Sequence, residues 1–348
     1  MPTDTTQYSE GVMAYVKRGE AIMAERAEAT RRMQACRFDT ISVHGLYTMK
    51  EALENNQGSI IEPAYLSTSQ HYADADEMEA GLAYLIPNWC YARIANPTTY
   101  YLEWMLALME GYGSGLETSA VVTASGMAAI MAAVDPFLVK RTKDPAERMN
   151  FVSSCHVYGG TFQQFAIRRD QDRGHEVRWV SKVADIDAWA ERIDEETRFL
   201  YVELPSTPTI SFVDLKSLAD LAHKNGIPLI VDSTVATPAL MRPLAHGADI
   251  VVHSVSKSMT SGGMGVGGVL VSRKNITSSI DNPDMNADFA TWVKFLPYRD
   301  NGPSMNPLQA TLIMNDLRTL RSKMDLVSRS SQTVAEFLQD HPKVERVN

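Results

Sequence analysis

Two charged residues stand where the chain is predicted to leave buried strands. Asp232 follows the apolar run at 227–231, and Lys257 comes shortly after a second such run at 248–253. Open α/β sheets bind ligands at the carboxyl ends of their strands. A lysine amine at that edge can form a Schiff base, and an aspartate can hold a ring nitrogen in its protonated form. A pyridoxal phosphate enzyme requires both groups, so we expect this cofactor.

The same cofactor needs a place for its phosphate. The segment Ser125-Gly126-Met127 opens a predicted helix, and the N-terminus of a helix offers free backbone N–H groups and a positive dipole end. Ser254 and Ser256 precede the lysine and can add hydroxyl donors. Each of these residues taken alone has a plainer role, as a helix cap or a turn former. Their combination favours the cofactor.

Other motifs in the chain are weaker. Residues 263–268 match G-x-G-x-x-G but precede a predicted strand at 269–271, the wrong context for a dinucleotide site. Residues 254–257 match S-x-x-K without the S-D-N or K-T-G partners of β-lactamases. The histidines show no metal-ligand spacing, and the 3 cysteines form no C-x-x-C pair. We therefore expect no metal site.

The elements that must position these residues alternate between strands and helices from about residue 100. Fully apolar strands separated by helices indicate a parallel sheet that is covered on both faces. A helix with an Asp214 cap and a stop at 225–226 precedes the strand that leads to Asp232. Residues 9–35 predict a helix with a narrow apolar stripe, and residues 40–100 an extended, loop-rich segment. Towards the end we expect helices at 305–325 and 326–340 and the start of a strand at 344–347.

Composition restricts the partners. The chain has 348 residues, of which 45% are hydrophobic and 22% charged, as in ordinary globular proteins. The 33 Lys and Arg against 42 Asp and Glu give a net charge of -9, which argues against a nucleic-acid partner. A polar N-terminus and the lack of long apolar runs argue against export and membrane insertion. We expect a cytoplasmic protein.

Several segments resemble the transsulfuration enzymes of cysteine and methionine metabolism, a group that includes cystathionine γ-synthase, O-acylhomoserine sulfhydrylases, cystathionine lyases and methionine γ-lyase. The resemblance extends from about Phe38 to the C-terminus. It rests on Tyr91-Ala-Arg93-Ile-Ala-Asn96-Pro97-Thr98, Thr123-Ala-Ser125-Gly126-Met127, Val157-Tyr158-Gly159-Gly160-Thr161, Val231-Asp232-Ser-Thr234 and Gly247-Ala-Asp249-Ile-Val-Val-His253-Ser254-Val-Ser256-Lys257.

This resemblance implies a fold-type-I pyridoxal phosphate enzyme with a mostly parallel, seven-stranded α/β sheet flanked by helices. Residues 1–95 would form an arm and an extended segment on a neighbouring subunit, and 96–302 the cofactor domain. Residues 303–348 would begin a smaller C-terminal α/β domain that is incomplete here. The chain would thus be a C-terminally truncated member, with its carboxylate-binding arginine beyond residue 348. The resemblance also implies an amino-acid substrate and homotetramers built from dimers that share active sites.

The resemblance also implies roles. Lys257 would be the Schiff-base lysine and proton shuttle, Asp232 the partner of the pyridine nitrogen, and Tyr158 the residue that stacks on the ring. Tyr91 and Arg93 would reach the phosphate of the neighbouring subunit. The cofactor-binding set would be Tyr91, Arg93, Ser125, Gly126, Met127, Tyr158, Glu203, Asp232, Thr234, Ser254, Ser256 and Lys257.

Three departures from the family pattern concern the substrate. Thr207 stands in the segment 203–208 where the family usually has an asparagine, the loop 261–265 is unusual, and Gly160 replaces the cysteine of methionine γ-lyases. We expect γ-replacement on an O-acylated homoserine through the Lys257 Schiff base. The alternatives are a C–S lyase, of the methionine γ-lyase or cystathionine lyase type, and a catalytically impaired paralogue that acts as a binding subunit.

Overall fold

The computed structural model describes residues 8–87, 89, 91–140, 148–260 and 262–347. Its centre is a seven-stranded sheet in the order β1-β7-β6-β5-β4-β2-β3. The strands are β1 (Thr118–Thr123), β2 (Met149–Ser154), β3 (His175–Val180), β4 (Thr197–Glu203), β5 (Leu229–Asp232), β6 (Ile250–His253) and β7 (Gly268–Arg273). Only β7 runs antiparallel to its neighbours β1 and β6. The expected mostly parallel seven-stranded sheet is confirmed.

Helices cover both faces of this sheet. They are α1 (Glu10–Gln34), α2 (Phe38–His44), α3 (Met49–Asn55), α4 (Ala75–Leu82), α5 (Pro97–Gly111), α6 (Gly126–Val134), α7 (Gly159–Gln163), α8 (Ile186–Ala190), α9 (Leu215–Lys224), α10 (Thr237–Leu240), α11 (Pro283–Ala287), α12 (Phe289–Val293), α13 (Arg299–Asn301), α14 (Pro307–Leu317) and α15 (Leu320–Gln339). Shorter 3-10 and π-helical segments are η1 (Asp135–Phe137), η2 (Gln164–Gln171), η3 (Pro243–His246) and η4 (Lys294–Tyr298).

Alternate residues of the strands point into two separate cores. Leu229 and Val231 of β5 pack with α5, α9 and α14 on one face. Ile230, between them, packs with α6 and α12 on the other face. Strands that are apolar at every position are therefore buried on both sides, as expected for the centre of a parallel sheet.

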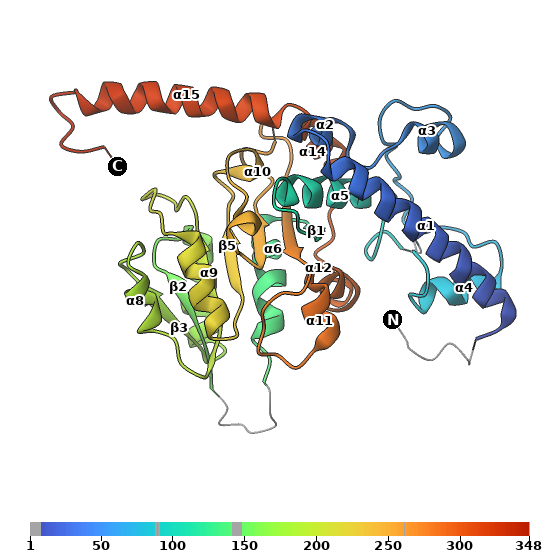
Figure 1. Ribbon diagram of the computed structural model, residues 1–348, viewed down its shortest axis with the longest axis horizontal. Helices are drawn as coiled ribbons and strands as arrows, with labels where there is room; N and C mark the ends of the chain where they lie inside the picture. The colour runs from blue at the N-terminus through green and yellow to red at the C-terminus, as the bar shows by residue number, and fades with distance from the viewer. Residues whose placement is uncertain (1–7, 88, 90, 141–147, 261, 348) are drawn as a thin grey trace.

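The two ends of the chain lie away from the sheet. α1 packs on α4 through a small cluster that includes Val12, Val16 and Ala80. α15 is anchored by Leu320 and Met324 near its start, and Figure 1 shows the rest of this helix projecting past the sheet. Within the part of the chain that is described, no helix combines the length and apolarity needed to cross a bilayer.

Some expected elements differ in the structure. The segment 40–100 contains the short helices α3 and α4, whose starts are capped by Thr48 and Asp74. Helices of seven or eight residues carry too little periodicity to be recognised. The last two helices were expected to meet at 325–326, but the break between them falls at 318–319. At this break the Arg318 guanidinium forms an ion pair with the Glu62 carboxylate, at 2.5 Å. The prediction of a strand at 344–347 is wrong. This stretch has no neighbouring strand to pair with among the described residues.

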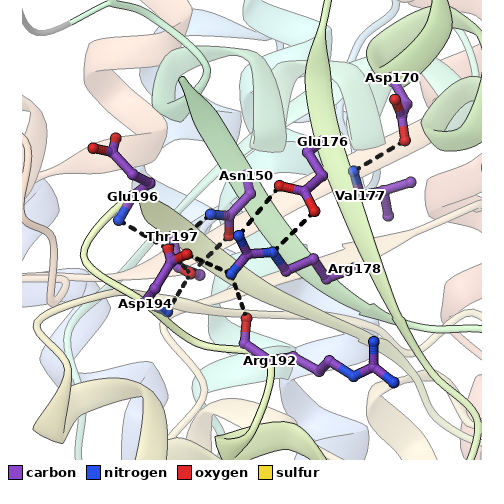
Figure 2. A network of polar contacts seen from close by, with 9 residues as sticks. All are labelled: Asn150, Asp170, Glu176, Val177, Arg178, Arg192, Asp194, Glu196 and Thr197. Carbon is purple, nitrogen blue, oxygen red and sulfur yellow. Dashed lines mark hydrogen bonds and ion pairs between the residues drawn. The ribbon is translucent and has the colours of Figure 1, made fainter. Parts of the chain in front are cut away.

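A polar network lies at the edge of the sheet formed by strand β3 (Figure 2). The Arg178 guanidinium lies between Glu176, at 3.2 Å, and Asp194, at 2.6 Å, and also donates to the Arg192 carbonyl. Asp194 in turn accepts a hydrogen bond from Asn150 at 2.8 Å, and such bonds hold its pKa below the ordinary value. This network ties β2, β3 and the loop before β4 together. It contains none of the candidate site residues.

Candidate active site

Asp232 and Lys257 follow adjacent parallel strands, and one hydroxyl group links their loops. Thr234 Oγ1 donates to Asp232 Oδ1 at 2.6 Å and accepts from the backbone N–H of Ser254 at 2.8 Å. The Thr234 N–H also donates to Asp232 Oδ1, at 3.0 Å. Lys257 lies three residues beyond Ser254 with an exposed side chain. The expected placement at the carboxyl edge of the sheet is thus seen in the structure.

Asp232 is deeply buried, with 6% of its surface exposed. Apart from Thr234, its polar neighbour is the Tyr201 hydroxyl, 3.4 Å from Oδ2. No lysine or arginine in the described chain forms an ion pair with it. Burial raises the pKa of Asp232, and the hydrogen bonds from Thr234 oppose that rise. A buried carboxylate in this state gains free energy from a cationic hydrogen-bond donor.

Glu203 lies beside Asp232, because the ends of β4 and β5 are paired in register. Its two oxygens accept hydrogen bonds from the backbone N–H groups of Tyr158, at 2.6 Å, and Thr207, at 2.8 Å. Burial and the nearby Asp232 raise the pKa of Glu203 to about 7. Glu203 therefore fixes the two loops that carry Tyr158 and Thr207.

The start of α6 packs against the loop of Lys257. A Cβ at Gly126 would lie 2.6 Å from Ser254 Cβ, so only glycine allows this approach. Ser125 caps the helix by accepting from the Ala128 N–H at 3.2 Å. The first N–H groups of a helix have no partner within it. This arrangement can hold an anion between the α6 N-terminus and Ser254.

Ser256 has a different environment. Its hydroxyl donates to the Gly267 carbonyl at 3.1 Å and accepts from the Gly267 N–H at 2.9 Å. The single hydroxyl proton is therefore used to hold the 256–267 loop. The unusual stretch 261–265 belongs to this loop, and Ser261 lies outside the described residues, as does Cys90.

Tyr158 stands at the open side of the site, with 51% of its surface exposed. A Cβ at Gly160 would lie 2.6 Å from Tyr158 Cε1 and 3.3 Å from Met127 Sδ. These distances bring the Tyr158 ring, Gly160 and Met127 together beside the helix start. Thr161, the next residue, is fully buried.

Tyr91 and Arg93 form a separate exposed pair. The Arg93 guanidinium lies 5.4 Å from the Tyr91 ring centre, and Nη1 donates to the Arg299 carbonyl. A Cβ at Gly302 would lie 3.3 Å from the Arg93 side chain. The next residue, Pro303, accepts from the Ala124 N–H at 2.7 Å, directly before Ser125. The pair therefore faces outward near the α6 N-terminus.

Two features were not expected from the sequence. Tyr201 donates to Asp232, and the alternation of side chains along β4 places it on the face of Glu203, two residues later. That alternation is the signal that could have found it. His253 and Glu110 form a fully buried pair at 2.6 Å between β6 and α5. Within the described residues, no group of His, Cys, Asp and Glu side chains gathers in a way that could hold a metal ion.

Comparisons with known proteins agree with this site. O-succinylhomoserine sulfhydrylase from Pseudomonas aeruginosa is 32% identical over 90% of this chain and 70% of its own length. L-methionine gamma-lyase from Porphyromonas gingivalis is 31% identical over 89% of this chain and 70% of its own. A crystal structure described as an O-acetylhomoserine (thiol)-lyase from Campylobacter jejuni, with a pyridoxyl-lysine phosphate, superposes with a TM-score of 0.76 at 29% identity. It covers 88% of this chain and 76% of that chain.

The family comparison covers most of the sequence. Residues 39–348 match the family described as Cys/Met metabolism PLP-dependent enzyme. The relatives in this family are enzymes, both sulfhydrylases and lyases. This chain therefore belongs to the Cys/Met metabolism family of pyridoxal-phosphate-dependent enzymes.

Proposed function

We propose that this chain catalyses γ-replacement on an O-acylated homoserine, in which a sulfur nucleophile takes the place of the acyloxy group. The supporting observation is the lack of space at Gly160. A Cβ there would meet the Tyr158 ring at 2.6 Å. The cysteine that methionine γ-lyases carry at this position would fit here only if the exposed Tyr158 ring moved. With sulfide as the nucleophile, the products are homocysteine and the free carboxylic acid.

The residues of the site fit the cofactor. Asp232 is a buried carboxylate that needs a cationic hydrogen-bond donor, and a protonated ring nitrogen is such a donor. The α6 N-terminus and Ser254 would hold the phosphate. When bound, pyridoxal phosphate supplies an electron sink that stabilises negative charge at the substrate Cα.

Each side chain then has a defined task. The exposed Lys257 amine would bind the cofactor covalently and afterwards move the proton of the substrate Cα. Tyr158 would offer its ring face for stacking and restrict water at the open side. Glu203 would keep both flanking loops in place through its bonds to Tyr158 and Thr207. The presence of Lys257, Asp232 and Tyr158 together supports a working enzyme over a binding subunit.

Elimination is the second candidate. The methionine γ-lyase of Porphyromonas gingivalis matches this chain about as well as the sulfhydrylase does, at 31% against 32% identity. In that reaction methionine and water would give methanethiol, ammonia and 2-oxobutanoate. The two reactions share the early proton removal at Cα and differ in whether a second nucleophile enters.

A substrate panel on the purified holoenzyme separates the two. O-acetyl- and O-succinylhomoserine with sulfide should yield homocysteine at a much higher kcat/KM than methionine yields 2-oxobutanoate. The reverse order would overturn γ-replacement and support the lyase. Loss of both reactions with an intact bound cofactor would support the binding subunit.

A pair of glycine variants tests the crowding argument. Gly160→Cys should displace Tyr158 and lose most of the turnover. Gly159→Cys is the matched control, because a Cβ at Gly159 meets no atom within 4 Å. If both variants keep wild-type kcat/KM, the space at Gly160 does not decide the reaction.

We further propose that active sites are shared in a dimer, with two dimers forming a tetramer. The exposed Tyr91 and Arg93 pair, placed near the α6 N-terminus, supports this arrangement because an arginine fork suits a phosphate. Mixed Arg93→Ala and Lys257→Ala subunits should regain activity that neither has alone. No recovery after verified subunit exchange would contradict shared sites.

Two further assignments belong to the same proposal. The unpaired thiols of Cys36 and Cys155 support a cytoplasmic location. In the division into 1–95, 96–302 and 303–348, the sheet, whose strands all lie between Thr118 and Arg273, supports 96–302 as the cofactor domain, although α14 of the part 303–348 packs into the core of that sheet. Limited proteolysis at these boundaries tests that division.

A further inference from the structure

A cavity outside the proposed active site lies between α1, α3 and α5. Its volume is about 290 Å³, at the lower end of small-molecule sites, which run from about 300 Å³ upwards. Aromatic side chains form much of its lining, among them Tyr65, Tyr101 and Trp104. None of the proposed catalytic residues lines it.

Arg26 of α1 supplies the one cationic side chain among the described lining residues. Its guanidinium lies 4.7 Å from the centre of the Trp104 ring. The Nη1 atom is buried and has no hydrogen-bond partner among the described residues. Burial lowers the pKa of Arg26 from its ordinary value, although a guanidinium stays charged at neutral pH.

Two other polar side chains of the lining, Glu51 and Tyr65, already have partners. Glu51 accepts a hydrogen bond from the Tyr101 hydroxyl. The Tyr65 hydroxyl donates to Asn56 Oδ1 at 2.6 Å. Glu51 and Tyr65 thus each have a partner, whereas Nη1 of Arg26 has none among the described residues, so it gains a hydrogen bond from a ligand that accepts one.

We propose that this cavity binds a small organic carboxylate whose apolar body lies among the aromatic rings. The carboxylate would accept hydrogen bonds from the Arg26 fork, which matches a planar carboxylate, and the rings would cover an apolar or aromatic group. α1 lies before residue 39, where the family match begins, so the arginine comes from a part of the chain that the match does not include.

The test is calorimetric titration of the holoenzyme with 3-phenylpropionate. This probe has a carboxylate and an aromatic ring but no amine, so it does not condense with the cofactor. The wild-type protein should bind it saturably, and 3-phenylpropanol, which lacks the charge, at least about tenfold more weakly. Equal affinity for acid and alcohol would overturn the proposal without requiring any variant.

Two variants locate the binding. Arg26→Gln should weaken binding of the acid about 10- to 100-fold and leave the alcohol nearly unchanged. Lys50→Gln is the matched control, since Lys50 is an exposed cation of α3 that pairs with Glu25 and does not line the cavity. If Arg26→Gln binds the acid with wild-type affinity, the acid binds at another site and the proposal is refuted. Near-UV circular dichroism verifies that the variants are folded.

Discussion

Thr234→Val tests the hydroxyl group that joins the loops of Asp232 and Lys257. Valine keeps the shape of threonine and removes a bond to Asp232 of 2.6 Å and one from the Ser254 N–H of 2.8 Å. A hydrogen bond to a charged group contributes about 1.5–3 kcal/mol, and a bond between neutral groups about 1 kcal/mol. Thr234 is half-buried, so water replaces part of both bonds. We expect a loss of about 2 kcal/mol in the free energy of unfolding.

The same change should weaken cofactor binding. The Thr234 hydroxyl opposes the burial that raises the pKa of Asp232. Without it that pKa rises further, and a protonated carboxyl no longer pairs with a cationic ring nitrogen. Urea unfolding of the cofactor-free protein and titration with pyridoxal phosphate measure the two effects.

Ser233→Ala is the matched control for this variant. Ser233 is a fully buried neighbour whose hydroxyl has no partner among the described residues. Its removal should change the free energy of unfolding by less than about 0.5 kcal/mol. If Thr234→Val behaves like Ser233→Ala in both measurements, the hydroxyl bridge does not hold the site together.

Other residues of the site give sharper losses. Lys257→Ala should keep the fold, because the side chain is exposed, and the cofactor should no longer attach covalently to the chain. If borohydride reduction of this variant still adds the mass of the cofactor to the chain, the assignment of Lys257 is wrong. Asp232→Asn should bind the cofactor more weakly, through Lys257 and the phosphate site, and lose most turnover, since an amide does not stabilise a cationic ring nitrogen; turnover within about threefold of wild type would contradict this role. The pKa of Glu203 is raised from 4.5 to about 7, so stability of the cofactor-free protein should fall as pH rises between these values, by roughly 3 kcal/mol at most. Glu203→Gln should flatten this dependence in urea unfolding, and an unchanged slope would exclude Glu203 as its source.

Local patterns in the sequence were sufficient for much of the site. The apolar runs before Asp232 and Lys257 predicted strands, and a parallel sheet brings the ends of its strands to one edge. The segment Ser125-Gly126-Met127 was predicted to open a helix, and α6 begins at Gly126, with Ser125 accepting a hydrogen bond from the Ala128 N–H. These features depend on neighbours within a few residues, so they can be inferred without a structure.

Other features depend on contacts between distant segments. The close approach of Gly126 to Ser254, and the register that sets Glu203 beside Asp232, follow from how the strands are ordered in the sheet. The bonds of Ser256 to Gly267 and the cavity beneath α1 arise in the same way, from loops and helices that meet only after folding. A one-dimensional pattern records the period of an element but not which element lies opposite. For that reason the sequence was enough to predict which reactive side chains lie at the sheet edge. Only the tertiary structure shows which other side chains hold these residues in position.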